Sequence, residues 1–172
     1  MREDLKENVK VSLQRLVPFI VSLVFILLNR IPSNLGYPNI IRPDIGCICV
    51  FYWVLYRPDL FNLFTVFVLG FISNLISTVP VGLEIISFLT IYLIVSNKFS
   101  IFNNKPFNVV WFGFSVILLF VEVLKWFILS VYHAEFISFG NLFFTILFTI
   151  ACYPVVSLIN ESVRKYLMND EG

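Results

Sequence analysis

Two opposite charges inside an apolar stretch are the first sign of chemistry in this chain. Glu122 and Lys125 stand three residues apart in the almost wholly apolar run from Val109 to Tyr132. That spacing puts both side chains on one face of a helix, where they can form an ion pair. Since lipid does not solvate charges, such residues face the bundle interior, a cavity or a partner. We therefore expect an intramembrane ion pair.

The sequence leaves the role of this pair open. In the simplest interpretation Glu122 stays ionised beside Lys125, and Lys125 extends toward the outer membrane surface. The alternatives are a contact with another membrane subunit and a proton or ligand site.

A second polar group comprises Glu84, His133 and Glu135, which lie at the ends of apolar segments. Together they offer an acid/base or metal site, but a carboxylate at a helix start needs only the helix dipole to explain it. The sequence has no H-E-x-x-H, no G-x-S-x-G, no phosphate-binding glycine loop, and no serine or cysteine beside a plausible base. We therefore predict no enzymatic activity, no catalytic residue, no cofactor and no metal site.

The cysteines and the net charge exclude further classes. Cys47 and Cys49 are two residues apart, so they point to different sides of a helix, and Cys152 lies far along the chain. Without a C-x-x-C or a Cys/His cluster, we expect them to pack as small apolar side chains. The net charge is +1, and no Lys/Arg stripe with interleaved aromatics is present, so nucleic acid is not an expected partner.

The elements that position these residues are apolar segments. Hydrophobic residues make up 59% of the chain and charged residues 13%, about half the charged share of a soluble domain. The long apolar runs lack the alternation of a β-barrel, and in lipid a helix satisfies its own backbone groups. The segments run from Val11 to Leu28, Ile45 to Tyr56, Leu60 to Val79, Val81 to Val95, Val109 to Tyr132 and Ile137 to Leu158.

These segments predict an all-α integral membrane protein, a compact bundle of about six transmembrane helices. A single membrane domain spans residues 1–172, with a cytoplasmic tail at 1–10, the bundle at 11–158 and a second cytoplasmic tail at 159–172. A helix needs about 20 residues to cross a bilayer, so the second and fourth segments are short. Whether residues 45–56 span fully is left open.

The distribution of basic residues predicts the orientation. With six crossings and the N-terminus inside, nine Lys or Arg fall on the cytoplasmic side and two in outer loops, which is a positive-inside bias. The nine are Arg2, Lys6, Lys10, Arg15, Arg57, Lys98, Lys105, Arg164 and Lys165, and the two are Arg30 and Arg42. No small-residue cleavage site follows the first segment, so we expect an uncleaved first helix and both termini in the cytoplasm.

Proline, glycine and small polar residues mark the ends and contacts of the helices. Arg42-Pro43-Asp44 and Arg57-Pro58-Asp59 each predict a helix start, with proline at the first position and aspartate complementing the dipole. Pro80-Val81-Gly82 predicts a tight turn. A strip of small and polar side chains at helical spacing predicts close packing against another helix or a partner surface. The strip comprises Gly70, Ser73, Asn74 and Ser77.

Taken in order, these motifs resemble the bacterial rod shape-determining protein MreD family. The series is Arg42-Pro43-Asp44, Tyr52-Trp53, Arg57-Pro58, Gly70 with Asn74, and Pro80-Val81-Gly82-Leu83. The resemblance covers the whole chain. It departs at Asn74, where the family commonly has an acidic residue, and at Val81, where leucine is usual.

The resemblance implies a non-enzymatic subunit of the machinery that elongates the bacterial side wall, in the cytoplasmic (inner) membrane. It implies partnership with MreC and, through it, with MreB, RodA and a class B penicillin-binding protein, with no small-molecule substrate. It also implies a fold like the substrate-binding subunits of energy-coupling-factor vitamin transporters. Such a transporter subunit is the alternative function, although the alanine pair that usually docks the partner is missing: the only alanines are Ala134 and Ala151.

Overall fold

The protein is a bundle of helices. The structure, a computed structural model, describes residues 16–29, 42–77, 79–97, 102, 105–134 and 139–169. These residues form six helices and no strand. The helices are Leu16–Asn29, α2 (Ile45–Tyr56), α3 (Leu63–Ile76), α4 (Leu83–Asn97), α6 (Phe107–His133) and α7 (Phe139–Asn169). The all-helical class is therefore confirmed.

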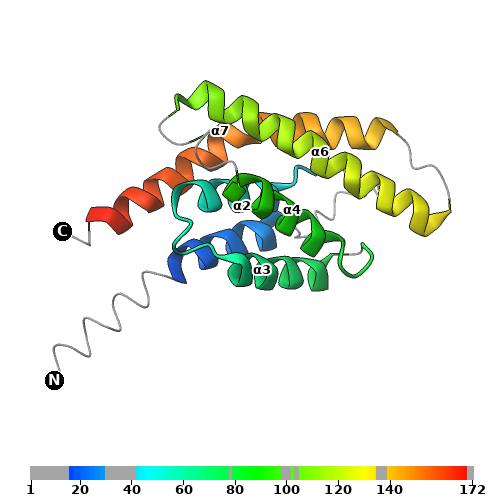
Figure 1. The fold of residues 1–172 in the computed structure, drawn as a ribbon, viewed down its shortest axis with the longest axis horizontal. Helices are drawn as coiled ribbons and strands as arrows, with labels where there is room; N and C mark the ends of the chain where they lie inside the picture. Colours follow the sequence, from blue (N-terminus) through cyan, green and yellow to red (C-terminus); the bar gives the residue numbers. More distant parts are fainter. Residues whose placement is uncertain are drawn as a thin grey trace, which may run out of the picture.

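The two longest helices lie side by side over the shorter ones (Figure 1). By length and composition, α6 and α7 are able to cross a membrane. The other four helices are also apolar but shorter. Helices α2, α3 and α4 have 12, 14 and 15 residues. Their crossing of the membrane stays a prediction.

Helix α2 forms the centre of the bundle. Ten of its 12 residues are buried, and it packs against α4 and α7. Phe51 makes edge contacts with the rings of Phe102, Phe114 and Tyr153. A helix that is apolar on every side is enclosed by other helices. At 1.5 Å per residue α2 is only about 18 Å long, so it does not bridge a ~30 Å bilayer core alone.

The first proline motif stands at a helix start as predicted, although its proline is not the first helical residue, and the second motif does not. Asp44 is the N-cap of α2, and its side chain accepts a hydrogen bond from the Cys47 N–H at 3.2 Å, so Pro43 precedes the helix. Arg57 is the C-cap of α2, and Pro58 lies in the turn that follows. A proline often follows a helix end because it cannot continue the helix.

Helix α3 begins later than predicted. Asn62 caps it, accepting a hydrogen bond from the Thr65 N–H at 3.0 Å. Asparagine is a strong N-cap, so the side chain of Asn62 rather than the preceding proline decides where the helix starts.

Helix α7 extends beyond the apolar segment that ends at Leu158, because it continues to Asn169. The cytoplasmic location of residues 159–172 stays a prediction. The polar end of α7 is stabilised by pairs along the helix: Glu161 lies 2.8 Å from Arg164 and 3.7 Å from Lys165. The Tyr52 hydroxyl donates to Glu161 at 2.5 Å, and Arg164 lies over the Tyr56 ring. These contacts tie the end of α7 to α2. Residues 170–172 lie outside the described part of the chain.

The strip of small residues on α3 faces α4 within the same chain. A Cβ atom on Gly70 would stand 2.9 Å from the Ile85 Cα, so a larger residue there forces the two helices apart. Ser73 and Asn74 are buried, whereas Ser77 is the C-cap of α3 and is half-buried. The described structure thus uses most of this strip for internal packing.

Asn74 joins α3 to the start of α4. Its Oδ1 accepts hydrogen bonds from the Gly82 N–H at 2.7 Å and the Glu84 N–H at 3.4 Å, and its Nδ2 donates to the Pro80 carbonyl at 3.3 Å. The predicted turn is confirmed: the Leu83 N–H donates to the Pro80 carbonyl, and Gly82 has a φ of 101°. Asn74, which lies on α3, therefore stabilises this turn through its side chain.

Replacing Asn74 with Leu should lower the free energy of unfolding by about 1–3 kcal/mol, because buried N–H groups of the turn lose their acceptor. Asn74→Asp should cost much less, since a carboxylate still accepts from Gly82 and Glu84 beside a helix N-terminus. Unfolding by SDS titration in mild detergent measures both values. Equal losses for the two variants would contradict the acceptor role.

Candidate functional site

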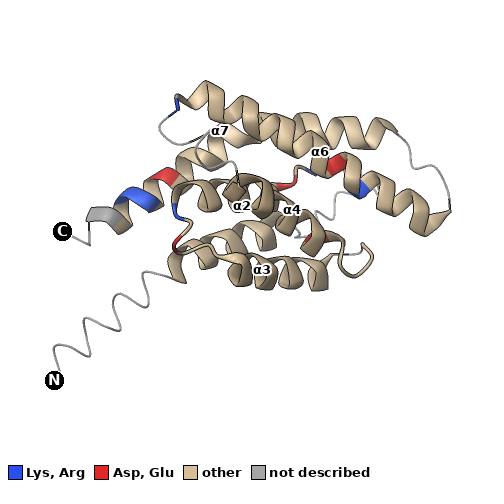
Figure 2. Ribbon diagram, in the orientation of Figure 1, with Lys and Arg blue, Asp and Glu red and all other residues tan. Residues whose placement is uncertain are grey.

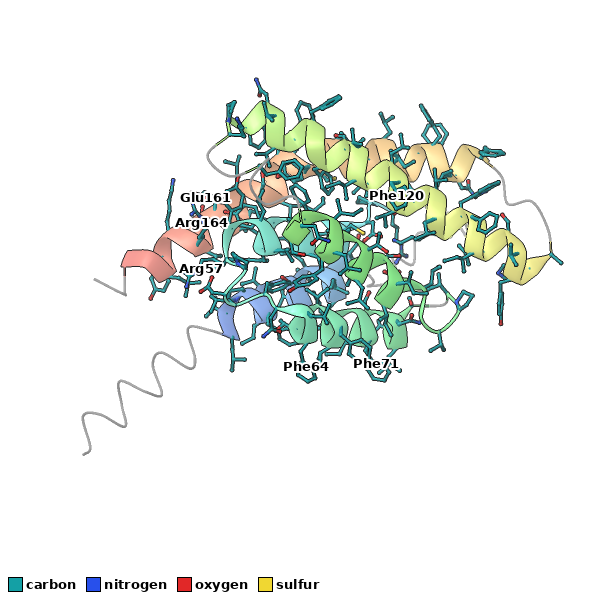
Figure 3. All side chains as sticks on the ribbon, viewed as in Figure 1. Arg57, Phe64, Phe71, Phe120, Glu161 and Arg164 are labelled. Carbon is teal, nitrogen blue, oxygen red and sulfur yellow. The ribbon has the colours of Figure 1, made fainter. Side chains whose placement is uncertain are left out.

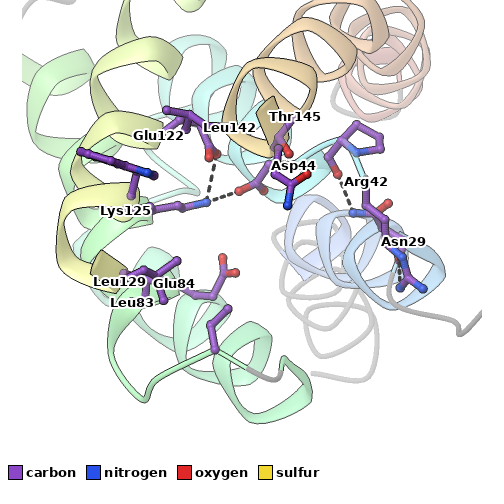
Figure 4. Close-up of a pocket in the computed structure, with 14 residues that line it drawn as sticks. Asn29, Arg42, Asp44, Leu83, Glu84, Glu122, Lys125, Leu129, Leu142 and Thr145 are labelled. Carbon is purple, nitrogen blue, oxygen red and sulfur yellow. Dashed lines mark hydrogen bonds and ion pairs between the residues drawn. The ribbon is translucent and has the colours of Figure 1, made fainter. Parts of the chain in front are cut away.

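The site is built around Lys125, whose ammonium group lies between two carboxylates. Its Nζ donates to Asp44 Oδ2 and, at 3.2 Å, to Glu122 Oε1 (Figure 4). Lys125 is 8% exposed and Glu122 6% exposed. We call Asp44, Glu122 and Lys125 the charged junction.

Three helices meet at the charged junction. Glu122 and Lys125 share one face of α6, and Asp44 caps α2. The Asp44 backbone N–H donates to the Thr149 hydroxyl of α7 at 2.8 Å. Asp44 is thus bound through its side chain to α6 and through its backbone to α7. Breaking a buried ion pair strands a charge, so these contacts hold the helices in one arrangement.

The predicted pair of Glu122 and Lys125 forms, and Lys125 has a second partner that the sequence did not indicate. Its side chain also donates to Asp44, which lies 81 residues earlier in the chain. The direction of Lys125 relative to the membrane surface stays a prediction. Two charge-assisted hydrogen bonds to carboxylates stabilise the buried ammonium group better than apolar neighbours would. The sequence motif marks Asp44 only as part of a helix start. The only sign in the sequence that Asp44 forms an ion pair is its position at the edge of a wholly apolar segment.

A cavity of about 300 Å³ opens beside the charged junction. Elements from one end of the bundle line it: the end of the first helix, the chain before α2, the turn before α4, and parts of α4, α6 and α7. The lining residues are Asn29, Arg42, Pro43, Asp44, Val79, Leu83, Glu84, Glu122, Lys125, Trp126, Leu129, Asn141, Leu142 and Thr145. Asn29 donates to the Pro43 carbonyl at 2.8 Å, and Arg42 donates to the Asn29 carbonyl at 3.4 Å.

The charged junction is poorly suited to a metal ion. The ligand atoms of Asp44, Cys47 and Glu122 lie within 4.8 Å of one another, which is close enough for shared coordination. However, Lys125 Nζ bonds both carboxylates and stands 3.9 Å from Cys47 Sγ. An ammonium group already supplies the positive charge at this point, so a metal ion would have to displace it.

The acid/base group suggested by the sequence is divided in the structure. Glu84 lines the cavity in the first turn of α4. His133 ends α6 beside the Tyr132 ring and is exposed, and it is not among the residues that line the cavity. Glu135 lies outside the described residues. The described part of the chain therefore places no histidine beside Glu84 in this cavity.

The fold and the site together define a helical membrane protein whose buried charges join its helices. The chain belongs to the family described as rod shape-determining protein MreD, which matches residues 10–163. The resemblance inferred from the motifs is thus confirmed, and the protein is a membrane protein related to cell shape.

Other comparisons add a distant relative. An uncharacterized protein of Rickettsia prowazekii (strain Madrid E), RP566, is 28% identical over 167 residues, which cover 94% of each chain. No solved structure matches the chain. The likeness to substrate-binding subunits of energy-coupling-factor transporters therefore stays a prediction.

Proposed function

We propose that the protein is a non-catalytic membrane subunit of the machinery that elongates the bacterial side wall, where it scaffolds MreC and the peptidoglycan synthases. The observation that carries this proposal is the family match over nearly the whole chain. MreB, RodA and a class B penicillin-binding protein would be reached through MreC. The mechanism is placement of partners rather than chemistry.

The outer surface of the long helices supports a scaffold in the membrane. Large apolar side chains are exposed on both helices, including Phe112, Phe120 and Phe127 on α6 and Phe143, Leu147 and Leu158 on α7. On α3, Phe64 and Phe71 also point away from the bundle (Figure 3). Lipid or the helices of partners would cover such faces, because water would not stabilise them.

The orientation belongs to the same proposal. Arg57 and Arg164 lie at one end of the bundle (Figure 3), and basic segments gather there (Figure 2). Positive charge favours the cytoplasmic side. We place this end in the cytoplasm and the cavity end toward the outside, in a multi-pass protein of the bacterial inner membrane with both termini in the cytoplasm.

The test is mass spectrometry of the proteins that co-purify with the tagged full-length chain from its native membrane in mild detergent. We expect an MreC-like protein together with a penicillin-binding protein. An unrelated multi-pass protein with the same tag is the control. Recovery of paired ATPases with a transmembrane coupling subunit would contradict the proposal and indicate a transporter component instead.

A further inference from the structure

The end cavity has the dimensions of a small binding site. Its volume of about 300 Å³ is at the lower end of the range for ligand pockets, about 300–1,000 Å³. A few polar groups converge on it between apolar walls formed by residues such as Leu83, Leu129 and Leu142. Polar groups placed on apolar walls in this way fix the orientation of a bound molecule.

The chemistry of the walls favours a cation. Glu84 is 4% exposed and points into the cavity across from Glu122, on the opposite side of the ammonium group of Lys125 (Figure 4). The lining holds three carboxylates, Asp44, Glu84 and Glu122, against two cationic side chains, Arg42 and Lys125. The wall therefore has a net negative charge, which attracts a cation in a low-dielectric site. Lys125 balances only part of this charge, because its one ammonium group is shared by Asp44 and Glu122.

Neutral polar groups and an aromatic ring complete the lining. Asn141 and Thr145, one helical turn apart on α7, add an amide oxygen and a hydroxyl to the wall. Trp126 lies one turn beyond Glu122 on α6. Aromatic rings attract organic cations, and amide and hydroxyl oxygens accept hydrogen bonds from an ammonium group.

We propose that this cavity binds an organic ammonium group, supplied by a small primary amine or by the headgroup of an aminophospholipid. Glu84 and Glu122 receive the ammonium, and the leucine walls contact the attached carbon chain. Both sources fit a cavity at the end of a membrane bundle. The proposal goes beyond the scaffold function and does not depend on it.

Ethanolamine is the first probe. Added to the purified full-length protein in detergent, it should raise the unfolding temperature saturably, whereas sodium chloride of equal ionic strength should not. Glu84→Gln should weaken the response about tenfold, since one charge-assisted hydrogen bond is lost. Phe127→Leu, on the exposed face of α6, is the matched control and should respond like the parent protein.

A second variant tests the proposal independently in case Glu84→Gln does not fold. Leu129→Trp fills the cavity without changing a charge and should abolish the response. Native mass spectrometry of protein from nanodiscs of phosphatidylglycerol, with and without phosphatidylethanolamine, tests the headgroup. A response to free ethanolamine supports the small amine, and retained phosphatidylethanolamine supports the lipid. No response to either probe, or an unchanged response in Leu129→Trp, would overturn the proposal.

Discussion

Replacing Asp44 with Asn is expected to lower the free energy of unfolding by about 3–5 kcal/mol, the usual cost of removing one partner of a buried ion pair. Asparagine still caps a helix, so the start of α2 keeps its hydrogen bond to the Cys47 N–H. The loss therefore comes from Lys125, which loses its ion pair with Asp44 and keeps the one with Glu122 at 3.2 Å. SDS titration of the purified protein in mild detergent measures it.

Asp59→Asn is the matched control for this experiment. Asp59 also pairs with a basic residue, Arg57 at 3.2 Å, but its side chain is 58% exposed. Exposed pairs contribute about 0–1 kcal/mol, so this variant should unfold almost like the parent protein. If Asp44→Asn were as mild as Asp59→Asn, the charged junction would not stabilise the bundle.

Gly70→Leu is expected to cost about 3 kcal/mol and to separate α3 from α4. A Cβ atom at this position meets the Ile85 backbone, which cannot move aside as the end of a flexible side chain can. Overpacking of this kind typically costs about 1–3 kcal/mol, and contact with backbone puts Gly70 at the upper end. Thermal unfolding in detergent, with a disulfide trap between cysteines introduced on α3 and α4, would report both effects.

Phe71→Leu is the control for the Gly70 variant. Phe71 is the next residue on α3 and is 45% exposed, pointing away from the bundle (Figure 3). A change on this outer face should shift stability by no more than about 0.5 kcal/mol. A Gly70→Leu protein that unfolds like the Phe71 control would rule out close packing at this point.

The sequence was sufficient to predict the helices because their signal is local. The segment predicted at 45–56 coincides with α2, and Val109 to Tyr132 agrees with α6 within two residues. Long apolar runs without alternation admit few other structures in lipid. The turn at Pro80-Val81-Gly82 follows from the same kind of local information.

Helix ends were harder to predict because different interactions compete there. Proline was expected at the first position of each helix, yet the side chains of Asp44 and Asn62 cap α2 and α3. The last predicted apolar segment ended at Leu158, but ion pairs of Glu161 and its contact with Tyr52 continue α7 beyond it. That contact joins residues 109 positions apart, which no local pattern reveals.

The site was predicted only in part for the same reason. The spacing of Glu122 and Lys125 indicated their common face, because residues three positions apart lie on the same side of a helix. Asp44 lies 81 residues from Lys125 in the sequence. Its contact with the Lys125 ammonium group depends on how α2 packs inside the bundle. The cavity also depends on packing, since it combines residues as far apart in the sequence as Asn29 and Thr145.

The ion pair between Asp44 and Lys125 joins α2 to α6. A double-mutant cycle with Asp44→Asn and Lys125→Met tests it most directly, through the free energies of unfolding of the parent, both single variants and the double variant. We predict a coupling energy of about 2–3 kcal/mol, with the double variant more stable than the sum of the single losses implies. Simple additivity of the two losses would contradict the account.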